Sequence, residues 1–178
     1  MKVSSWFSKI LGTQLTLENL DTLLVLQLRD LYSAETQLIE ALPKMAEAAH
    51  APELKQAFHS HLGETRRQKD RLEQAFRAMG QKPETETCEA MQGLVSEGQE
   101  IIDMDGDPDV KDAALIAAAQ RVEHYEIAGY GCARAFARRK GRTQVAALLQ
   151  ETLDEEKKAD ELLTAIAEDS VNVQAAHS

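Results

Sequence analysis

The sequence predicts an all-α protein in which four long helices form a bundle, with one long crossover that carries a short extra helix. Helix-forming residues dominate the 178 residues, whereas Gly and Pro number only 9 and 4. Apolar residues recur every three or four positions through four long segments, and this spacing places them on one face of a helix. The first and last connections are short and the central one is long, so we expect two antiparallel helical hairpins.

The first predicted helix runs from a cap at Thr16 to about Ala49. Residues 1–15, which hold the only Trp of the chain, precede it as an N-terminal arm. The sequence leaves open whether this arm docks on its own domain, docks on a second subunit or stays mobile. The apolar stripe of the helix consists of Leu24, Leu28, Leu31, Leu38, Leu42 and Met45.

The second predicted helix begins at Pro52, a residue suited to the first helical turn, and ends near Met79. Gly80 is a natural stop for it. The crossover follows, and we expect one short helix within residues 81–106. The apolar side of that short helix carries Met91, Leu94, Val95, Ile101 and Ile102.

The third predicted helix runs from about Pro108 to Lys140, with Asp107 as its cap, and Gly141 ends it. The fourth begins near Thr143 and stops before a polar tail, residues 169–178. The crossover is long enough to span the length of a bundle, which is the connectivity of ferritin-like four-helix bundles. We therefore expect one ferritin-like domain over residues 16–168.

The composition argues against several classes of partner. A net charge of −10 disfavours nucleic acid and anionic membrane surfaces. No apolar run reaches the roughly 18 residues that a membrane span needs, and the N-terminus lacks the apolar region of a signal peptide. With only Cys88 and Cys132 in the chain, a disulfide framework is not expected and a cytoplasmic location is.

Each long helical segment carries an acid near its middle, on or beside the apolar stripe. A buried carboxylate without a partner costs several kcal/mol, so these acids need a cation, a shared proton or a metal. One alternative is a salt-bridged core that uses Arg67, Lys158 or Arg121. We favour a metal because all four helices share the feature. The acids are Glu35, Glu64, Glu123 with Glu126, and Glu155.

A dinuclear carboxylate site in a helical bundle usually takes one Glu from each of two helices and Glu-x-x-His from each of the other two. In this chain neither Glu64 nor Glu155 is followed by the expected His. His61, one turn before Glu64, is a candidate substitute; the other interpretation is a hydrogen-bonded interior His. Glu156 is the alternative to Glu155, since it has an apolar line of its own, formed by Leu149, Leu153 and Leu163.

Four motifs resemble a known family: Leu-Tyr-Ser-Ala-Glu35, His61-x-x-Glu64-Thr, the long run ending in Glu123-His-Tyr-Glu126-Ile-Ala, and Glu151-Thr-Leu-Asp-Glu155-Glu-Lys. Because of these four motifs, residues 16–173 resemble the YciE/YciF stress-protein family, a branch of the ferritin-like superfamily. The resemblance implies a stress-related protein that forms helical homodimers. It also implies a rubrerythrin-like centre with two iron ions, manganese being the alternative. The expected metal ligands are Glu35, His61, Glu64, Glu123, Glu126 and Glu155.

Two functions from different classes follow from these expectations. In the first, the dinuclear centre makes the protein an oxidoreductase that reduces peroxide or activates dioxygen. In the second, the protein is a non-catalytic structural stress protein whose metal ties the helices together. Iron storage in a multi-subunit shell is weaker, because the sequence carries no signal for cage assembly.

Overall fold

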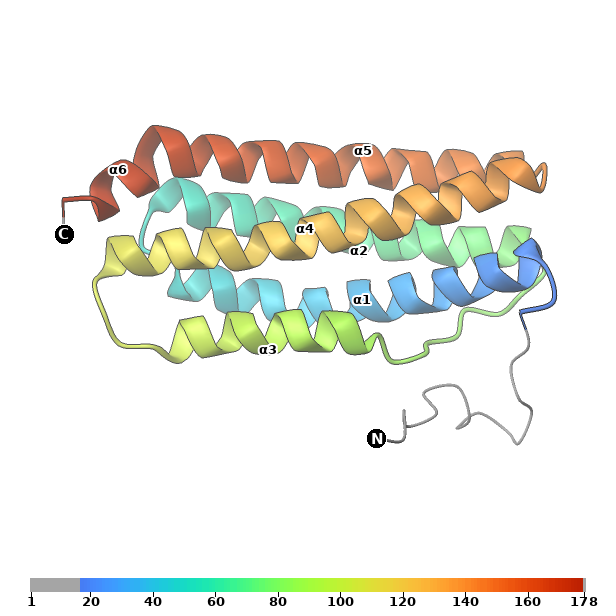
Figure 1. Cartoon of the computed structure of the whole chain (residues 1–178), viewed down its shortest axis with the longest axis horizontal. Helices are drawn as coiled ribbons and strands as arrows, with labels where there is room; N and C mark the ends of the chain where they lie inside the picture. Colours follow the sequence, from blue (N-terminus) through green and yellow to red (C-terminus); the bar gives the residue numbers. More distant parts are fainter. Residues whose placement is uncertain (1–16, 178) are drawn as a thin grey trace.

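The structure, a computed structural model, describes residues 17–177 and is helical throughout that range apart from its connections (Figure 1). The predicted arm, residues 1–15, and the predicted cap Thr16 lie outside the described residues. The five main helices are α1 (Leu20–Ala48), α2 (Pro52–Ala78), α3 (Glu89–Asp103), α4 (Pro108–Arg139) and α5 (Thr143–Ile166). A π-helical turn, η1 (Ala167–Val171), and a short α6 (Asn172–Ala175) follow.

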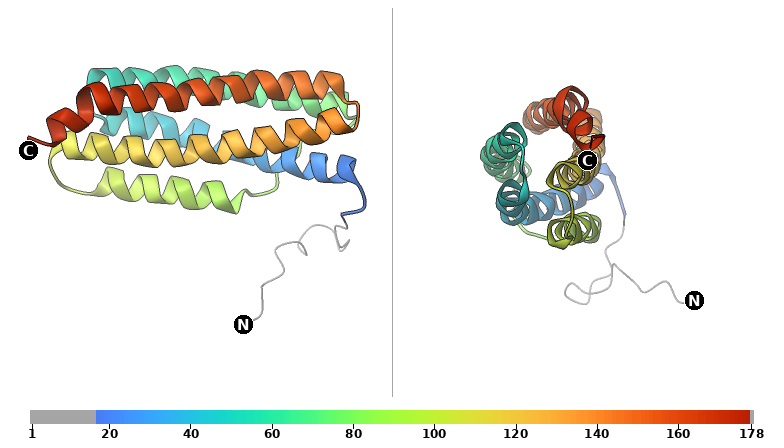
Figure 2. Two further views of the ribbon diagram at one scale, coloured as in Figure 1. Left: turned by 45° about the horizontal axis from the view of Figure 1, so that its top comes forward. Right: turned by 90° about the vertical axis from the view of Figure 1, so that its left-hand side faces the viewer.

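The four long helices α1, α2, α4 and α5 run side by side as a bundle, and α3 lies outside it along α1 and α4 (Figures 1 and 2). Short turns join α1 to α2 and α4 to α5, so each pair is an antiparallel hairpin. The crossover that contains α3 returns along the bundle, from the end of α2 to the far end where α4 begins (Figure 1). The predicted fold class and its long crossover with a short helix are confirmed.

The helix ends follow ordinary capping chemistry. Asp107 caps α4 as predicted, because its Oδ1 accepts hydrogen bonds from the backbone N–H groups of residues 109 and 110 at 2.9 and 3.2 Å. Gly80 and Gly141 each have φ 69°, the left-handed conformation that ends α2 and α4. The start of α1 was predicted too early: Asn19 is its cap, and its Oδ1 accepts from the N–H of Thr22 at 3.0 Å.

The C-terminal segment departs from the expected polar tail, because the chain stays helical beyond Asp169, as far as Ala175. Val171 explains this: its side chain is 1% exposed and packs in the same cluster as Ile166. Burial of an apolar side chain in this size class is worth about 1.5–3 kcal/mol, which favours continuing the helix against the bundle.

The core consists of two apolar clusters separated by a polar layer. One cluster includes Leu38, Leu42, Leu54, Phe58, Leu115 and Leu163. The other includes Leu28, Leu31, Leu72, Phe76, Tyr130 and Leu153. On each long helix, buried polar residues fall between members of the two clusters: Glu35 on α1, His61 on α2, Glu123 and Glu126 on α4, and Glu156 on α5. The polar layer therefore lies near the middle of the bundle, with apolar packing on both sides.

Two further observations describe the chain as a whole. Cys88 is buried and Cys132 is exposed, and neither forms a disulfide. Within residues 17–177, no helix has the length and apolar character that a membrane span requires.

Candidate metal centre

Three helices bring four potential metal ligands together inside the bundle. His61 comes from α2, Glu123 and Glu126 from α4, and Glu156 from α5. One ligand atom from each lies within 4.8 Å of the others. These four residues, called the His/Glu cluster below, are nearly inaccessible: His61 is 6% exposed, Glu123 2%, and the other two 0%. Such a density of ionisable groups in an apolar interior is what a cation site requires.

Glu35 adds an acid from the remaining long helix, α1. Its side chain is fully buried, and its Oε1 accepts a hydrogen bond from the hydroxyl of Tyr130. Within the cluster, the Nε2 atom of His61 lies 3.4 Å from Oε1 of Glu123 and 3.8 Å from Oε2 of Glu156. All four long helices thus contribute to the polar layer, as the sequence pattern predicted.

Most of the polar atoms in this layer have no hydrogen-bond partner. Leaving one buried polar atom unpaired costs about 1–3 kcal/mol, and more when the group is charged. The observed arrangement is therefore unfavourable unless cations or protons occupy the space among these atoms. Carboxylate oxygens and an imidazole nitrogen suit iron and manganese, so the residues present fit the expected ions. The unpaired atoms are Oε2 of Glu35, Nε2 of His61, Oε2 of Glu123, and both carboxylate oxygens of Glu126 and Glu156.

The electrostatics agree with this interpretation. Burial raises the pKa of Glu35 to about 8 and raises the pKa of Glu123 as well. Burial together with the neighbouring acids raises the pKa values of Glu126 and Glu156 well above the ordinary value. For His61, burial lowers the pKa, but the facing carboxylates, chiefly Glu123, outweigh it and raise the pKa to about 9. Without a cation, Glu35 and His61 therefore retain protons at neutral pH, and the raised pKa values of the other three acids favour their protonated forms.

Glu64 contacts the other side of the His61 ring and lies outside the His/Glu cluster. Its Oε2 is 3.5 Å from Nδ1 of His61, and its side chain is 32% exposed. The neighbouring Thr65 hydroxyl donates to the backbone carbonyl of His61 at 2.9 Å. The structure therefore turns Nε2 of His61 toward the cluster and places Glu64 at Nδ1, the other nitrogen of the ring.

The prediction that Glu155 fills the inward position on α5 is wrong, and the alternative, Glu156, takes that position. Glu155 instead forms two hydrogen bonds of 2.6 Å with the guanidinium of Arg71 and accepts another from Gln68 at 3.1 Å. One residue along a helix is a rotation of about 100°, so only one of two adjacent acids can face the cluster. The sequence contains the residue that decides between the two acids: Arg71 lies one turn beyond Gln68 on α2. The spacing of apolar residues alone does not reveal that Arg71 pairs with Glu155.

The alternative of a salt-bridged core does not match the structure. The side chain of Arg67 is 59% exposed; it donates to the backbone carbonyl of Gly63 at 2.9 Å and lies 4.0 Å from the carboxylate of Glu64. Lys158 and Arg121 are exposed on the bundle surface. Arg71, a buried arginine, is paired with Glu155 and with Glu151 at 3.0 Å. None of these cations neutralises the acids of the polar layer.

The fold and the site together define a four-helix bundle with a buried layer of carboxylates and one imidazole. Residues 19–176 match the family described as a domain of unknown function, DUF892, and the chain belongs to this family. It is similar to Protein YciF of Escherichia coli K12, with 44% identity over 162 residues that span 90% of this chain and 98% of that protein. The expected family resemblance is confirmed.

Solved structures support the same assignment. The crystal structure of the E. coli stress protein YciF has a TM-score of 0.84 and 45% identity, covering 87% of this chain and 98% of the other. YcfI of Rhodopseudomonas palustris, described as a proposed structural protein, has a TM-score of 0.82 and 44% identity, covering 85% and 96%. A Xanthomonas campestris protein with 24% identity and a TM-score of 0.72, covering 89% and 98%, supports the fold alone.

Proposed function

We propose that this chain is a stress-response protein with a dinuclear iron centre, manganese being the alternative metal, and that the centre handles peroxide or dioxygen. The observation that carries the proposal is that both carboxylate oxygens of Glu126 and of Glu156 are buried without a partner. Folding has removed these groups from water, and a protonated His61, whose Nε2 lies 3.8 Å from Oε2 of Glu156, balances at most one of the negative charges of the layer. A site of this kind gains its stability when cations bind.

The charge of the layer supports two ions per chain. Glu35, Glu123, Glu126 and Glu156 are four buried carboxylates, with a combined charge of −4 when ionised. Two divalent cations balance this charge, whereas one leaves half of it uncompensated. We assign these acids and Nε2 of His61 as the ligands. Of the residues expected from the sequence, Glu64 then orients His61 and Glu155 serves the ion pair with Arg71.

The protein residues around the centre hold and isolate it. The Tyr130 hydroxyl fixes the Glu35 carboxylate by a hydrogen bond, and the contact with Glu64 fixes the His61 ring. The apolar clusters on both sides exclude water, which strengthens every charge interaction within the layer. When bound, iron or manganese would supply a Lewis acid with open positions for an exogenous ligand and an accessible change of oxidation state.

Elemental analysis after anaerobic purification tests the proposal. We expect close to two iron or manganese ions per chain, and a large loss of metal in Glu126→Ala. An iron-reconstituted protein that retains no stoichiometric metal would overturn the proposal, including its enzymatic part.

A structural role for the same metal site is the competing function, and the description of the R. palustris relative as a proposed structural protein favours it. Turnover of hydrogen peroxide by the metal-loaded protein, compared with Glu126→Ala, separates the two functions. Turnover that disappears in the variant supports the oxidoreductase. A fully loaded protein without turnover, but with raised thermal stability, supports the structural role.

We further propose that the protein is a homodimer, as the family resemblance implies, and that it is cytoplasmic, as its two unpaired cysteines suggest. Exposed apolar side chains, among them Met104 at 57% and Val110 at 49%, offer surface for a second copy. Light scattering at micromolar concentration should give the mass of a dimer, and a monomer mass would contradict it. Removal of residues 1–14 tests whether the N-terminal arm contributes to the dimer.

A further inference from the structure

A chamber of about 100 Å³ lies between α2 and α5 and reaches the His/Glu cluster from one side. Its inner end is formed by His61 and Glu123. Its outer end is formed by Glu64, Lys158 and Leu162, the last of which is 49% exposed. Glu35, Glu126 and Glu156 do not line it. Any molecule in this chamber therefore meets the centre at the pair His61 and Glu123.

The two residues at the inner end of the chamber, His61 and Glu123, also carry unsatisfied polar atoms. The Nε2 atom of His61 and the Oε2 atom of Glu123 have no hydrogen-bond partner, and both side chains are more than nine-tenths buried. An ion held by these two residues would border the chamber directly. Glu35 and Tyr130, which hydrogen-bond to each other, do not line the chamber.

The walls and the volume restrict what the chamber can hold. Apart from its two polar ends, it is lined mainly by Ala57, Phe58, Ala159 and Leu163. An apolar cavity of about 150 Å³ holds benzene, so about 100 Å³ admits only a smaller molecule. Pockets for organic ligands are usually about 300–1,000 Å³. The chamber thus suits a ligand of a few heavy atoms better than an organic substrate of ordinary size.

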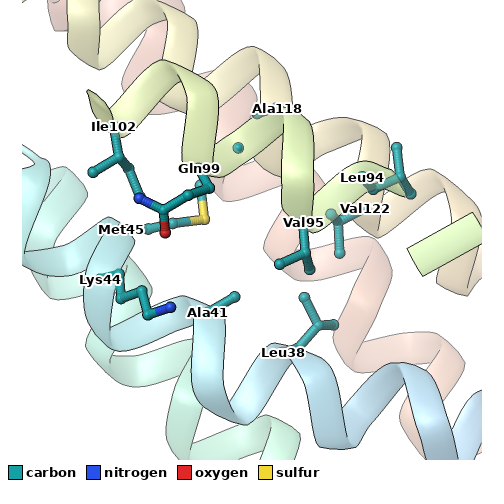
Figure 3. Close-up of a pocket in the computed structure, with 11 residues that line it drawn as sticks. Leu38, Ala41, Lys44, Met45, Leu94, Val95, Gln99, Ile102, Ala118 and Val122 are labelled. Atoms are coloured by element: carbon teal, nitrogen blue, oxygen red, sulfur yellow. The ribbon is translucent and has the colours of Figure 1, made fainter. Parts of the chain in front are cut away.

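Three other cavities among residues 17–177 do not reach the centre. A slot of about 30 Å³ beneath α3 is lined by side chains such as Leu38, Met45 and Val95 (Figure 3). Two wider hollows lie near Arg29 and near Arg138. None of these three contains a residue of the His/Glu cluster.

We infer that the chamber between α2 and α5 is the binding pocket for the exogenous ligand of the centre, and that it selects dioxygen or hydrogen peroxide by size. This inference rests on the proposed metal centre. Ala159 and Leu162 are the residues that set its dimensions, Ala159 at the wall and Leu162 at the mouth. The Lys158 ammonium and the Glu64 carboxylate at the mouth present opposite charges, so the entrance has no net charge to repel a small neutral or anionic ligand.

Azide is a three-atom probe for this pocket, and cobalt(II) is a spectroscopic probe for the centre. We expect cobalt-loaded protein to change its visible spectrum saturably with azide and to show no change with benzoate, which is larger than the chamber. Ala159→Leu adds three carbons to the wall and should weaken azide binding about tenfold or more, with cobalt stoichiometry unchanged. Ala165→Leu makes the same change at an exposed position on α5 and should leave azide binding unaltered.

The outcomes separate this inference from the proposed function. If the wild-type protein binds no cobalt, both fail. If cobalt binds and azide binds equally to the wild type and to Ala159→Leu, or if benzoate binds as well as azide, the inference is wrong and the metal centre stands. If Ala159→Leu also loses cobalt, Leu162→Trp at the exposed mouth decides: slower azide association with the same final spectrum supports the pocket, and an unchanged rate overturns it.

Discussion

Arg71 and Glu155 form a bidentate ion pair that joins α2 to α5, with both nitrogen–oxygen distances at 2.6 Å. The pair sits beside the polar layer and is nearly closed to solvent, since Arg71 is 9% exposed. It fixes the rotation of α5, because a charged fork of this geometry tolerates little displacement. With Glu155 held by Arg71, the next residue, Glu156, faces the interior.

The two adjacent acids of α5 should therefore give different phenotypes. Glu156→Gln removes a proposed ligand charge, so we expect metal affinity to fall about tenfold or more. Glu155→Gln removes the bidentate partner of the guanidinium and leaves it the more exposed Glu151, so we expect a loss of about 1–3 kcal/mol in the free energy of unfolding, with metal content unchanged. Elemental analysis and urea unfolding measure the two effects. The reverse pattern would show that Glu155 is the ligand.

Asp112 should prove important for stability although it lies far from the centre along α4. Its side chain is 1% exposed, and its two oxygens accept hydrogen bonds from the backbone N–H groups of His50 and Ala51 at 2.8 and 2.6 Å. Asp112→Ala strands both N–H groups in the turn between α1 and α2. Each stranded group costs about 1–3 kcal/mol, so we expect a total loss of about 2–6 kcal/mol in the free energy of unfolding, measured in urea.

Asp109, a half-buried acid in the first turn of the same helix, is the matched control for Asp112. Its replacement by Ala should change stability by less than about 0.5 kcal/mol. Equal effects of the two substitutions would mean that the Asp112 hydrogen bonds contribute nothing measurable.

Gly98 offers a stabilising substitution. It is buried on α3 beside the slot shown in Figure 3, and a Cβ added there meets no atom within 4 Å. Gly98→Ala should raise the free energy of unfolding by about 0.5–1 kcal/mol, because alanine restricts the unfolded chain and favours the helix. Gly141→Ala, at φ 69°, should instead lower it by about 1–2 kcal/mol. Urea unfolding of both variants checks the contrast, and a destabilised Gly98→Ala would contradict it.

The sequence predicted the helices and the polar layer well, because both depend on local periodicity. Glu35 interrupts a stripe of leucines, and Glu123 and Glu126 are three residues apart on one helix, so each is visible without knowing the neighbours. The choice between Glu155 and Glu156 is different in kind. Both positions have apolar residues at helical spacing, and what decides between them is Arg71, which comes from another helix.

Most of the other differences between prediction and structure also arise from contacts between residues distant along the chain; the cap of α1 is the exception. The cap of α1 is a local choice among several acceptable residues, so a prediction three residues early is a small error. The helical extension to Ala175 was missed because the composition after Asp169 is polar. Only the packed bundle reveals that Val171 reaches the core. The role of Glu64 depends on which way the ring of His61 turns, and sequence spacing does not determine that.

The metal-free protein should lose stability as the pH rises. The pKa of Glu35 is raised to about 8 and that of His61 to about 9 in the folded state. Between pH 5 and 9 the folded chain therefore binds more protons than the unfolded chain. The free energy of unfolding then falls as the pH rises, by up to about 1.4 kcal/mol per pH unit for each extra proton. Groups with lowered pKa values, such as Glu53 and Glu64, lose their contribution only at more acidic pH.

Metal should reverse this dependence. In the loaded protein, protons compete with the ions for the same carboxylates, so stability should rise from pH 5 to 8. Thermal melting of both forms across this range should give slopes of opposite sign. Glu126→Gln provides the control, because it removes one acid whose pKa is raised and should make the metal-free slope shallower. Parallel slopes in the two forms would mean that the added ions do not bind at the buried acids, and that the polar layer is stabilised by protons alone.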